Sequence, residues 1–489
     1  MNAEAEPTLR GRASGGRIAR AFSMQFVARI VGLVASIGTV ALTTRSLGPG
    51  PYGQLSAAIM FIGLWSSLTE LGIGAVIVRR VTGGTGDLSR LVRVNAGFSL
   101  TYCLPLGAAS SLSGWLLYRD DPLVVGMIAI ISGSLVLTTL SSCVQPVFVT
   151  DVRFGAIALS DLLGRLLSFG LTFLLVHVGA DLYWYALVQL IPPLVVLLIQ
   201  GGVARRIVDL RPIFSFRESW ELVRESLPQT GVLVIAALYW RSDGVLLSVL
   251  SSKEETGAYN LAYTVAFNAT VISTVFLAST LSTMTNLFAT DRARFARFTV
   301  RSIQLMLFVA VPLAVAGALL APELVRLLGS EDFVAAGGST LGLLFVAVAI
   351  RLVTGTLSQG LFAAHDQVFL LRLNIVSLLL NIGLNVVLIP QFGAKGAAAA
   401  LVVSELFGLA VATRRLAGRT PYRTPWLFLA RLIPAVAAAA TVCVVGHALP
   451  VLLTGAAAAV AYLAVNLVLG PVRLRDARGL LSSEEGTPE

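Results

Sequence analysis

Polar and charged side chains recur at helical spacing inside stretches of the chain that are otherwise apolar. The first such stretch places a polar or small residue at every third or fourth position, a spacing that keeps these residues on one face of an α-helix. An unsatisfied polar group that faces lipid costs several kcal/mol, so we expect this face to contact protein or water. The face consists of Gln25, Arg29, Gly32, Ser36, Thr39 and Thr43.

Three later stretches carry similar polar faces. In the first of them Asp161 precedes Arg165 by four residues, which brings an acid and a base together on one side of a helix. Two or more polar faces that converge predict a polar lumen between helices. The three faces consist of Asp161, Arg165, Ser168 and Thr172; of Arg351, Thr354 and Ser358; and of Asn374, Ser377, Asn381 and Asn385.

The arginines within these stretches suggest the chemistry of the lumen. Arg29, Arg165, Arg241 and Arg351 would each cost at least about 2.5–3.5 kcal/mol at membrane depth. A guanidinium group donates paired, charge-assisted hydrogen bonds to phosphate oxygens, so an arginine-lined cavity suits an anionic headgroup. Arg29 and Arg165 could instead lie outside the cavity, with their long side chains reaching the membrane surface. Arg165 could also be neutralised by Asp161.

Two sets of candidate site residues follow from these patterns. The acids Glu70, Asp161, Asp243 and Glu405 are candidates for ion coupling, and for Glu70 and Glu405 a structural pairing with an arginine is an equal alternative. Arg241 and Asp243 are two residues apart and point to different sides of a helix. The candidate substrate-binding residues are Arg29, Gln25, Ser36, Arg165, Arg241, Arg351, Asn381 and Asn385.

The elements that position these residues are membrane-spanning helices. The 489 residues are 56% hydrophobic and only 13% charged, with a mean hydropathy of +0.84. Soluble domains carry roughly 25% charged residues. Apolar runs of roughly 20 residues recur along the chain, which is the length needed to cross the hydrocarbon core. We therefore predict an all-α integral membrane protein.

About 14 spans meet this length criterion. Their apolar runs do not alternate as the strands of a membrane barrel would. The predicted spans are 21–44, 54–78, 94–117, 123–144, 156–178, 182–203, 227–250, 258–287, 302–320, 333–363, 368–390, 394–411, 426–448 and 451–469.

The basic residues predict the orientation of the spans. With a cytoplasmic N-terminus, roughly 27 of the 36 Lys and Arg residues fall on the inside and about 5 on the outside. A missed or invented span would invert half of this pattern. We therefore expect both termini in the cytoplasm, and we interpret the net charge of +10 as a feature of topology and lipid headgroups, with no nucleic-acid partner.

The chain also contains an internal duplication. The segment from Leu166 to Leu171, which leads to Gly179-Ala180, is repeated from Leu379 to Leu384, which leads to Gly393-Ala394. A weaker echo pairs 47–53 (LGPGPYG) with 250–257 (LSSKEETG). Because the repeat contains an even number of helices, the two halves enter the membrane from the same side and form parallel bundles with a cavity between them.

The predicted domains follow from this repeat. They are a basic arm (1–20), an N-terminal six-helix bundle (21–203), an amphipathic cytoplasmic linker (204–226), a C-terminal six-helix bundle (227–416), two further helices (426–472) and a cytoplasmic tail (473–489).

Several function classes do not fit the sequence. A P-loop needs Gly-Lys followed by Ser or Thr, and the two lysines, Lys253 and Lys395, both lack that context. The three cysteines are far apart within apolar segments, and the three histidines are scattered, so neither set predicts a metal site. The predicted outer loops are too short to hold the catalytic carboxylates of a glycan-assembling enzyme. We expect no catalytic residues, no metal, no cofactor and no enzymatic activity.

Two segments carry a resemblance to a known family. The run from Leu47 to Arg80, LGPGPYGQLSAAIMFIGLWSSLTELGIGAVIVRR, and the run from Arg241 to Tyr263, RSDGVLLSVLSSKEETGAYNLAY, resemble polysaccharide and oligosaccharide flippases of the O-antigen and teichuronic-acid exporter type. These belong to the multidrug/oligosaccharidyl-lipid/polysaccharide exporter superfamily. The resemblance implies alternating access and a saccharide on a polyprenyl pyrophosphate, with Arg29 best matched to a pyrophosphate-holding arginine.

The resemblance also sets the remaining expectations. The expected partners are a lipid-linked saccharide, membrane lipids, H+ or Na+, and proteins of glycan polymerisation or assembly. The expected location is the inner (plasma) membrane. The alternatives are a drug exporter of the same superfamily and, less favoured, a membrane enzyme of glycan assembly.

Overall fold

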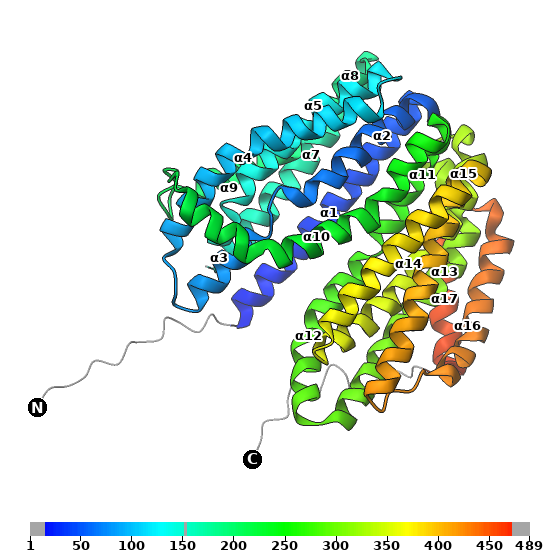
Figure 1. The fold of residues 1–489 in the computed structure, drawn as a ribbon. Helices are drawn as coiled ribbons and strands as arrows, with labels where there is room; N and C mark the ends of the chain where they lie inside the picture. The colour runs from blue at the N-terminus through cyan, green and yellow to red at the C-terminus, as the bar shows by residue number, and fades with distance from the viewer. Residues whose placement is uncertain (1–14, 151–153, 472–489) are drawn as a thin grey trace, which may run out of the picture.

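The computed structural model describes residues 15–150 and 154–471, and among these every regular element is a helix (Figure 1). The predicted all-α class is confirmed. Twelve of the described helical stretches are long and apolar enough to span a membrane. The helix α4 (Leu88–Leu117) is not among these twelve, and α15 (Gln367–Arg419) covers two predicted spans, so these two helices account for the difference from 14.

The other elements nearly all overlap the predicted spans, and two of them are much longer, because 216–250 and 292–328 are helical where 227–250 and 302–320 are predicted. They are α1 (Gly15–Leu47), α2 (Pro49–Trp65), η1 (Ser66–Leu68), α3 (Ile73–Thr82), α5 (Pro122–Ser142), α6 (Gln145–Thr150), α7 (Phe154–Val178), α8 (Leu182–Val188), α9 (Ile191–Ala204), α10 (Phe216–Leu250), α11 (Lys253–Asn268), α12 (Val271–Thr290), α13 (Arg292–Leu328), α14 (Glu331–Ala363), α16 (Trp426–Val445), η2 (Gly446–Ala448) and α17 (Val451–Leu469).

Some predicted spans are broken rather than continuous. Between α2 and α3 the chain leaves the helix, and Leu71 and Gly72 adopt left-handed φ values of 47° and 66°. Hydroxyl groups help to satisfy the backbone there, because Ser142 donates to the Thr69 carbonyl and Thr230 donates to that of Leu71. Irregular backbone at membrane depth is tolerated only where protein or water satisfies it.

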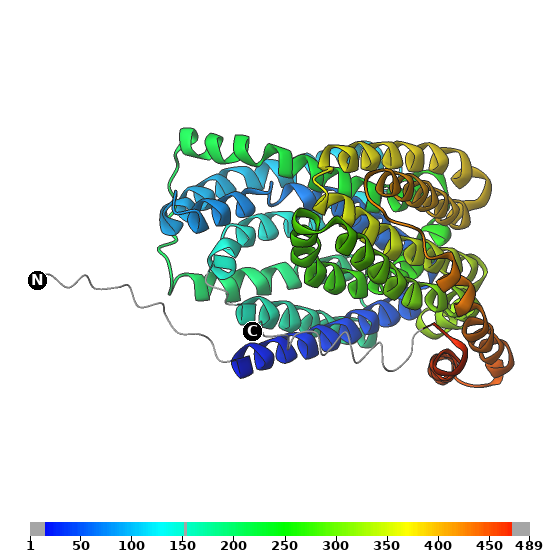
Figure 2. The same cartoon turned by 90° about the horizontal axis from the view of Figure 1, so that it is seen from below.

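The helices form two lobes (Figures 1 and 2). The N-lobe contains α1–α9 and the first part of α10, and the C-lobe contains the second part of α10 together with α11–α17. Seen from below, the blue-to-cyan helices and the green-to-red helices make two neighbouring groups (Figure 2). The helices α16 and α17 pack on α13 at the outside of the C-lobe, where Tyr462 donates to the Phe308 carbonyl.

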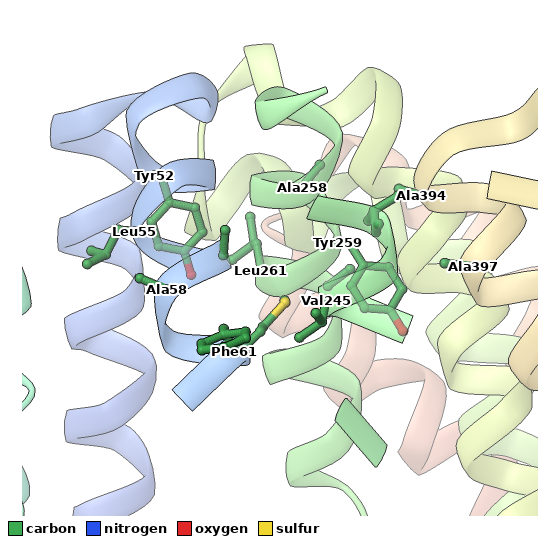
Figure 3. Close-up of a cluster of buried hydrophobic side chains, with 14 of the residues drawn as sticks. Tyr52, Leu55, Ala58, Phe61, Val245, Ala258, Tyr259, Leu261, Ala394 and Ala397 are labelled. Carbon is green, nitrogen blue, oxygen red and sulfur yellow. The ribbon is translucent and has the colours of Figure 1, made fainter. Parts of the chain in front are cut away.

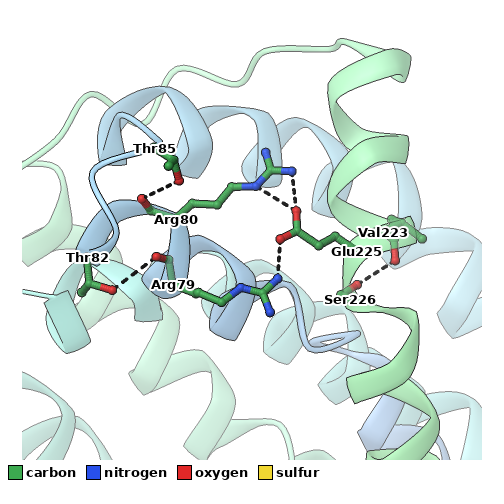
Figure 4. A network of polar contacts seen from close by, with 7 residues as sticks. All are labelled: Arg79, Arg80, Thr82, Thr85, Val223, Glu225 and Ser226. Carbon is green, nitrogen blue, oxygen red and sulfur yellow. Dashed lines mark hydrogen bonds and ion pairs between the residues drawn. The ribbon is translucent and has the colours of Figure 1, made fainter.

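The helix α10 belongs to both lobes. Near its start, Glu225 binds both Arg79 and Arg80 of α3 (Figure 4), and Glu218 binds Arg90 of α4 at 3.0 Å. Farther along, α10 packs against α2 and α15. Residues 216–226, at the end of the predicted linker, continue into this helix without a break.

The lobes meet at one end, which we call the joined end. Its apolar part is formed by side chains from α2, α10, α11 and α15, including Leu55, Phe61, Val245, Leu261 and Ala397 (Figure 3). Its polar contacts include Thr44 to the Leu328 carbonyl at 2.9 Å and Arg45 to the Leu327 carbonyl at 2.6 Å. Toward the opposite end the ribbons of the two lobes diverge (Figure 1). There, within the described part of the chain, no hydrogen bond or ion pair joins α1–α9 to α11–α17.

The glycines of the duplicated segments occupy matching positions. Gly179 and Gly393 both have left-handed backbones, with φ values of 64° and 56°, at the turns that end the two copies. Gly53 and Gly257, which end the weaker echo, lie against each other at the joined end. A Cβ on Gly257 would lie 3.1 Å from the Gly53 nitrogen, so only residues without side chains let α2 and α11 approach this closely.

Candidate functional site

Five predicted site residues come together in the C-lobe and form what we call the C-lobe polar cluster: Asp243, Arg351, Asn381, Asn385 and Glu405. They lie on α10, α14 and α15, and α15 packs against both of the other helices. All except Arg351 are fully buried. Two buried carboxylates in one cluster lower the stability of the fold unless hydrogen bonds, protons or cations stabilise them.

Asp243 is held by neutral donors. Asn385 Nδ2 donates to Asp243 Oδ1 at 2.8 Å, and the Tyr259 hydroxyl lies 3.3 Å from Oδ2. Asn385 Nδ2 also lies 3.1 Å from Asn381 Oδ1. The Asn385 Oδ1 atom is buried and has no hydrogen-bond donor. Asn381 also contacts the Asp243 carboxylate, and no described arginine or lysine forms an ion pair with it.

Glu405 has a different environment. The Tyr239 hydroxyl donates to its Oε1 at 2.9 Å, and Arg351 Nη1 lies 3.7 Å from the same oxygen. The Arg351 guanidinium carbon also lies 4.8 Å from the centre of the Trp240 ring, in a cation–π arrangement. Glu405 thus has an arginine partner, which the sequence left as one of two alternatives.

A second group of predicted residues lies in the N-lobe. Arg165 Nε donates to Asp161 Oδ2 at 3.0 Å, and its Nη1 donates to Ser36 Oγ of α1 at 2.7 Å. Gly32 makes room for this arginine, because a Cβ there would lie 3.0 Å from its Cδ. The polar faces predicted for the first and fifth spans therefore meet where α1 packs on α7.

The remaining predicted residues make fewer contacts. Arg29 is exposed on α1, one turn before Gly32, and Glu70 is exposed in the break between α2 and α3. The side chains of these two residues form no hydrogen bond or ion pair with the residues that the structure describes. Arg241 is half-buried between the lobes, where a Cβ on Gly63 of α2 would lie 3.2 Å from its Nε. The side chain of Gln25 lies outside the described residues.

The sequence reasoning missed the aromatic residues around the C-lobe polar cluster. Tyr239 and Trp240 lie on α10, and Tyr259, Tyr263 and Phe267 follow one another on α11 at intervals of four residues. That interval places them on one face of the helix. The same interval was the feature of the sequence from which this aromatic face could have been predicted. They went unnoticed because aromatic residues at helical spacing usually serve only to fill a core.

The polar contacts of the joined end were also missed. Lys253 Nζ at the start of α11 lies 2.6 Å from Asp121 Oδ2, and Gln54 Nε2 of α2 donates to both oxygens of that carboxylate. Partial burial raises the pKa of Asp121, but hydrogen bonds from Lys253, Gln54 and the Val124 amide outweigh this and hold it below its usual value. Asn260 of α11 donates to Tyr52 and Ser56 of α2.

These elements define a multi-pass, all-α membrane protein of the fold seen in two groups of transporters. The structure is similar to the lipid II flippase MurJ in an inward closed conformation, with a TM-score of 0.77 and 13% identity over 94% of this chain and 99% of that one. It is also similar to an inward-facing multidrug resistance transporter of the MATE family, within the MOP superfamily, with a TM-score of 0.66 and 14% identity over 81% of this chain and 98% of that one.

Sequence comparison then gives the family. Residues 42–336 match the family described as polysaccharide biosynthesis protein, and the chain belongs to that family. A relative from Haloferax volcanii, described as the probable flippase AglR, is 27% identical over 430 residues, which cover 82% of this chain and 83% of AglR. The resemblance seen in the two sequence segments is confirmed at the level of family and fold.

Proposed function

We propose that this protein is a secondary flippase that moves a polyprenyl-pyrophosphate-linked oligosaccharide across the inner membrane for polysaccharide biosynthesis. The observation that carries the proposal is the arrangement of two lobes, joined at one end and diverging at the other, with arginines on faces of both lobes. Membership of the polysaccharide biosynthesis family and the similarity to AglR support a saccharide as cargo. The similarity to MurJ and MATE structures supports a transporter fold for the protein that moves this cargo.

The proposed mechanism is alternating access. With both termini in the cytoplasm, the joined end faces outward and the diverging end faces the cytoplasm, where the lipid-linked substrate is made. The charged headgroup enters between the lobes while the prenyl chain stays in lipid. Breaking the contacts of the joined end and closing the opposite end then exposes the headgroup outside.

The arginines that lack an acidic partner are the proposed receptors for the pyrophosphate. Arg29 and Arg241 form no ion pair with any described residue, so their donors are free for phosphate oxygens. Arg165 is partly neutralised by Asp161 and contacts Ser36. We assign Arg165 a supporting role in which it holds α1, and thereby Arg29, in place.

The proposed coupling site is Asp243. A cation such as Na+ would bind the Asp243 carboxylate together with Asn381 Oδ1 and, after rotation of the Asn385 amide, Asn385 Oδ1, and hard cations prefer such oxygen ligands. A proton on Asp243 would neutralise the same group. Glu405 is already balanced by Arg351, and Asp161 by Arg165, so both fit a coupling role less well. Glu70 lies apart in the helix break.

The decisive experiment follows headgroup exposure in liposomes. Purified protein is reconstituted with a fluorescent polyprenyl-pyrophosphate oligosaccharide, and the fraction of headgroup accessible from outside is measured. We expect transport above protein-free liposomes, and we expect Arg29→Ala to abolish it while membrane insertion is retained. Arg119→Ala, which removes an exposed arginine from the loop between α4 and α5, is the matched control. Normal transport by Arg29→Ala would remove the pyrophosphate role.

The MATE-like fold makes a drug exporter the second candidate. A cationic drug favours a site dominated by carboxylates, whereas the faces described here carry both arginines and acids. Failure to move any lipid-linked glycan under a proton or sodium gradient, together with efflux of a cationic dye, would favour this candidate. Glycan polymerisation by the purified protein would instead favour a membrane enzyme.

A further inference from the structure

A shallow pocket of the C-lobe combines aromatic rings with an arginine and a carboxylate. Trp240, Tyr263, Phe267, Arg351 and Glu405 line it, and small or aliphatic residues of α11, α14 and α15 complete its walls. Ligand sites commonly have this composition, in which apolar and aromatic walls surround a few convergent polar groups.

The aromatic rings of the pocket are ordered against one another. The rings of Trp240 and Phe267 meet edge to face with centroids 4.9 Å apart, and Tyr263 stacks on Phe267 at 5.0 Å. The Tyr263 hydroxyl donates to the Trp240 carbonyl at 3.0 Å, which ties α11 to α10. All three side chains are only half-buried, so part of each ring surface borders the pocket.

The polar groups of the pocket have unused hydrogen-bonding capacity. The 3.7 Å between Arg351 Nη1 and Glu405 Oε1 exceeds a hydrogen bond, and the Arg351 side chain, 35% exposed, donates no hydrogen bond to another described residue. Glu405 accepts one hydrogen bond, from Tyr239, and a carboxylate can accept several. A ligand with adjacent hydroxyl groups could accept from Arg351 and, once it displaces the side chains that cover the buried Glu405 carboxylate, donate to Glu405 as well.

The pocket lies directly beside the contact between the lobes. On α11, Asn260 binds α2, and Tyr263 and Phe267 follow on the same helical face toward the diverging end. On α10, Gly244 packs against Met60 of α2, and Trp240 lies one turn before it in the same direction. The pocket is therefore next to Arg241, at the apex of the space between the lobes.

We propose that this pocket binds a sugar ring of the translocated headgroup. The inference rests on the proposed function and adds where the saccharide is recognised. The apolar C–H face of a pyranose packs on aromatic rings, while its hydroxyl groups both donate and accept hydrogen bonds. The other candidate ligands fit less well: Glu405 repels a phosphate, Arg351 repels a cationic drug, and a prenyl chain would leave both charges without partners.

The test compares two soluble competitors that differ only in the sugar. Full-length protein in liposomes transports a fluorescent polyprenyl-pyrophosphate N-acetylglucosamine, and farnesyl-pyrophosphoryl-N-acetylglucosamine and farnesyl pyrophosphate are added as inhibitors. In the wild type we expect the sugar-bearing compound to inhibit about tenfold more strongly, which is the scale of one good aromatic contact with its hydrogen bonds. The quantity compared is the ratio of the two inhibition constants. Trp240→Ala and Glu405→Gln should bring this ratio close to one, whereas Trp240→Phe should largely preserve it.

The controls separate the two proposals. Trp220→Ala removes an exposed tryptophan from the same helix and should leave the ratio unchanged. A wild-type ratio of one, or an unchanged ratio in Trp240→Ala, would overturn the sugar pocket while the flippase proposal stands. Absence of transport and of inhibition by either compound in the wild type would overturn the proposed function itself.

Discussion

The two buried acids of the C-lobe are stabilised in different ways, and this difference underlies the separate roles that we propose for them. Glu405 has Arg351 beside it, whereas Asp243 has only amide and hydroxyl donors. The positive charge of Arg351 balances Glu405. We propose that a bound cation or a proton balances Asp243.

Substitution of Asp243 tests this distinction. We expect Asp243→Asn to fold, because asparagine is nearly the same size, and to transport at a rate that no longer responds to an imposed sodium or proton gradient. Glu405→Gln is the matched control and should keep its response to the gradient. The measurement is the initial rate of headgroup exposure with and without each gradient. An unchanged gradient response in Asp243→Asn would place the coupling ion elsewhere.

The Asp121 carboxylate gives a prediction about pH. Its pKa is lowered below the usual 3.8, so its contribution to the joined end is complete above that value and is lost only as the pH falls through the lowered pKa. We expect the accessibility of a cysteine at Met60, which is buried against Gly244, to be constant between roughly pH 5 and 8. Asp121→Asn should raise its labelling by a membrane-impermeant maleimide throughout that range. Equal labelling in both proteins would show that the carboxylate does not hold the lobes together.

Contacts within one helix could be predicted at the residue scale, and contacts between helices could not. The four-residue spacing of Asp161 and Arg165 predicted their ion pair, because neighbours on one helix are fixed by its geometry. The contact of Arg165 with Ser36 depends on how α1 packs on α7, which the sequence spacing does not encode. The functional roles of the predicted site residues stay predictions.

At the scale of helices, the pair Gly53 and Gly257 sets how closely α2 and α11 approach. Gly257→Val would place a branched side chain against the Pro49 carbonyl and the Gly53 backbone, so we expect it to separate the lobes at the joined end. A cysteine introduced by Met60→Cys should then react several-fold faster with the membrane-impermeant maleimide from outside. Gly202→Val on α9, where a Cβ would meet nothing within 4 Å, is the control. Unchanged labelling in Gly257→Val would mean that α2 and α11 adjust without opening.

The ends of some helices were predicted well, whereas the extensions of α10 and α13 beyond their apolar spans and the interruptions of other helices were not. Apolar length determines where a span must start and stop, so α5, α14 and α17 begin and end within about two residues of their predicted bounds. The break at Leu71 and Gly72 is stabilised by hydroxyl groups from α5 and α10, which are distant in sequence. Hydropathy averages over such breaks and therefore predicts one continuous helix.

At the scale of the whole molecule, the ion pair between Asp121 and Lys253 allows the lobes to be locked. A carbodiimide joins a lysine amine to a nearby carboxylate as an amide with loss of water, and these groups are 2.6 Å apart. In a Lys395→Arg background, Lys253 is the remaining lysine of the chain. We expect treatment to cross-link the pair and to abolish transport, and peptide mass spectrometry measures the cross-link. Lys253→Arg protein should stay active after treatment, and full transport by cross-linked protein would contradict opening at this end.

The joined end is held by an apolar cluster, by hydrogen bonds, by one ion pair and by a close helix contact. Each hydrogen bond contributes on the order of 1 kcal/mol, so the polar contacts add a few kcal/mol to the apolar contacts that favour the closed form. A shift of about 1.4 kcal/mol changes the ratio of the closed to the open form tenfold. A headgroup that reverses which form predominates must therefore bind the open form more tightly by more than the free-energy difference between the two forms.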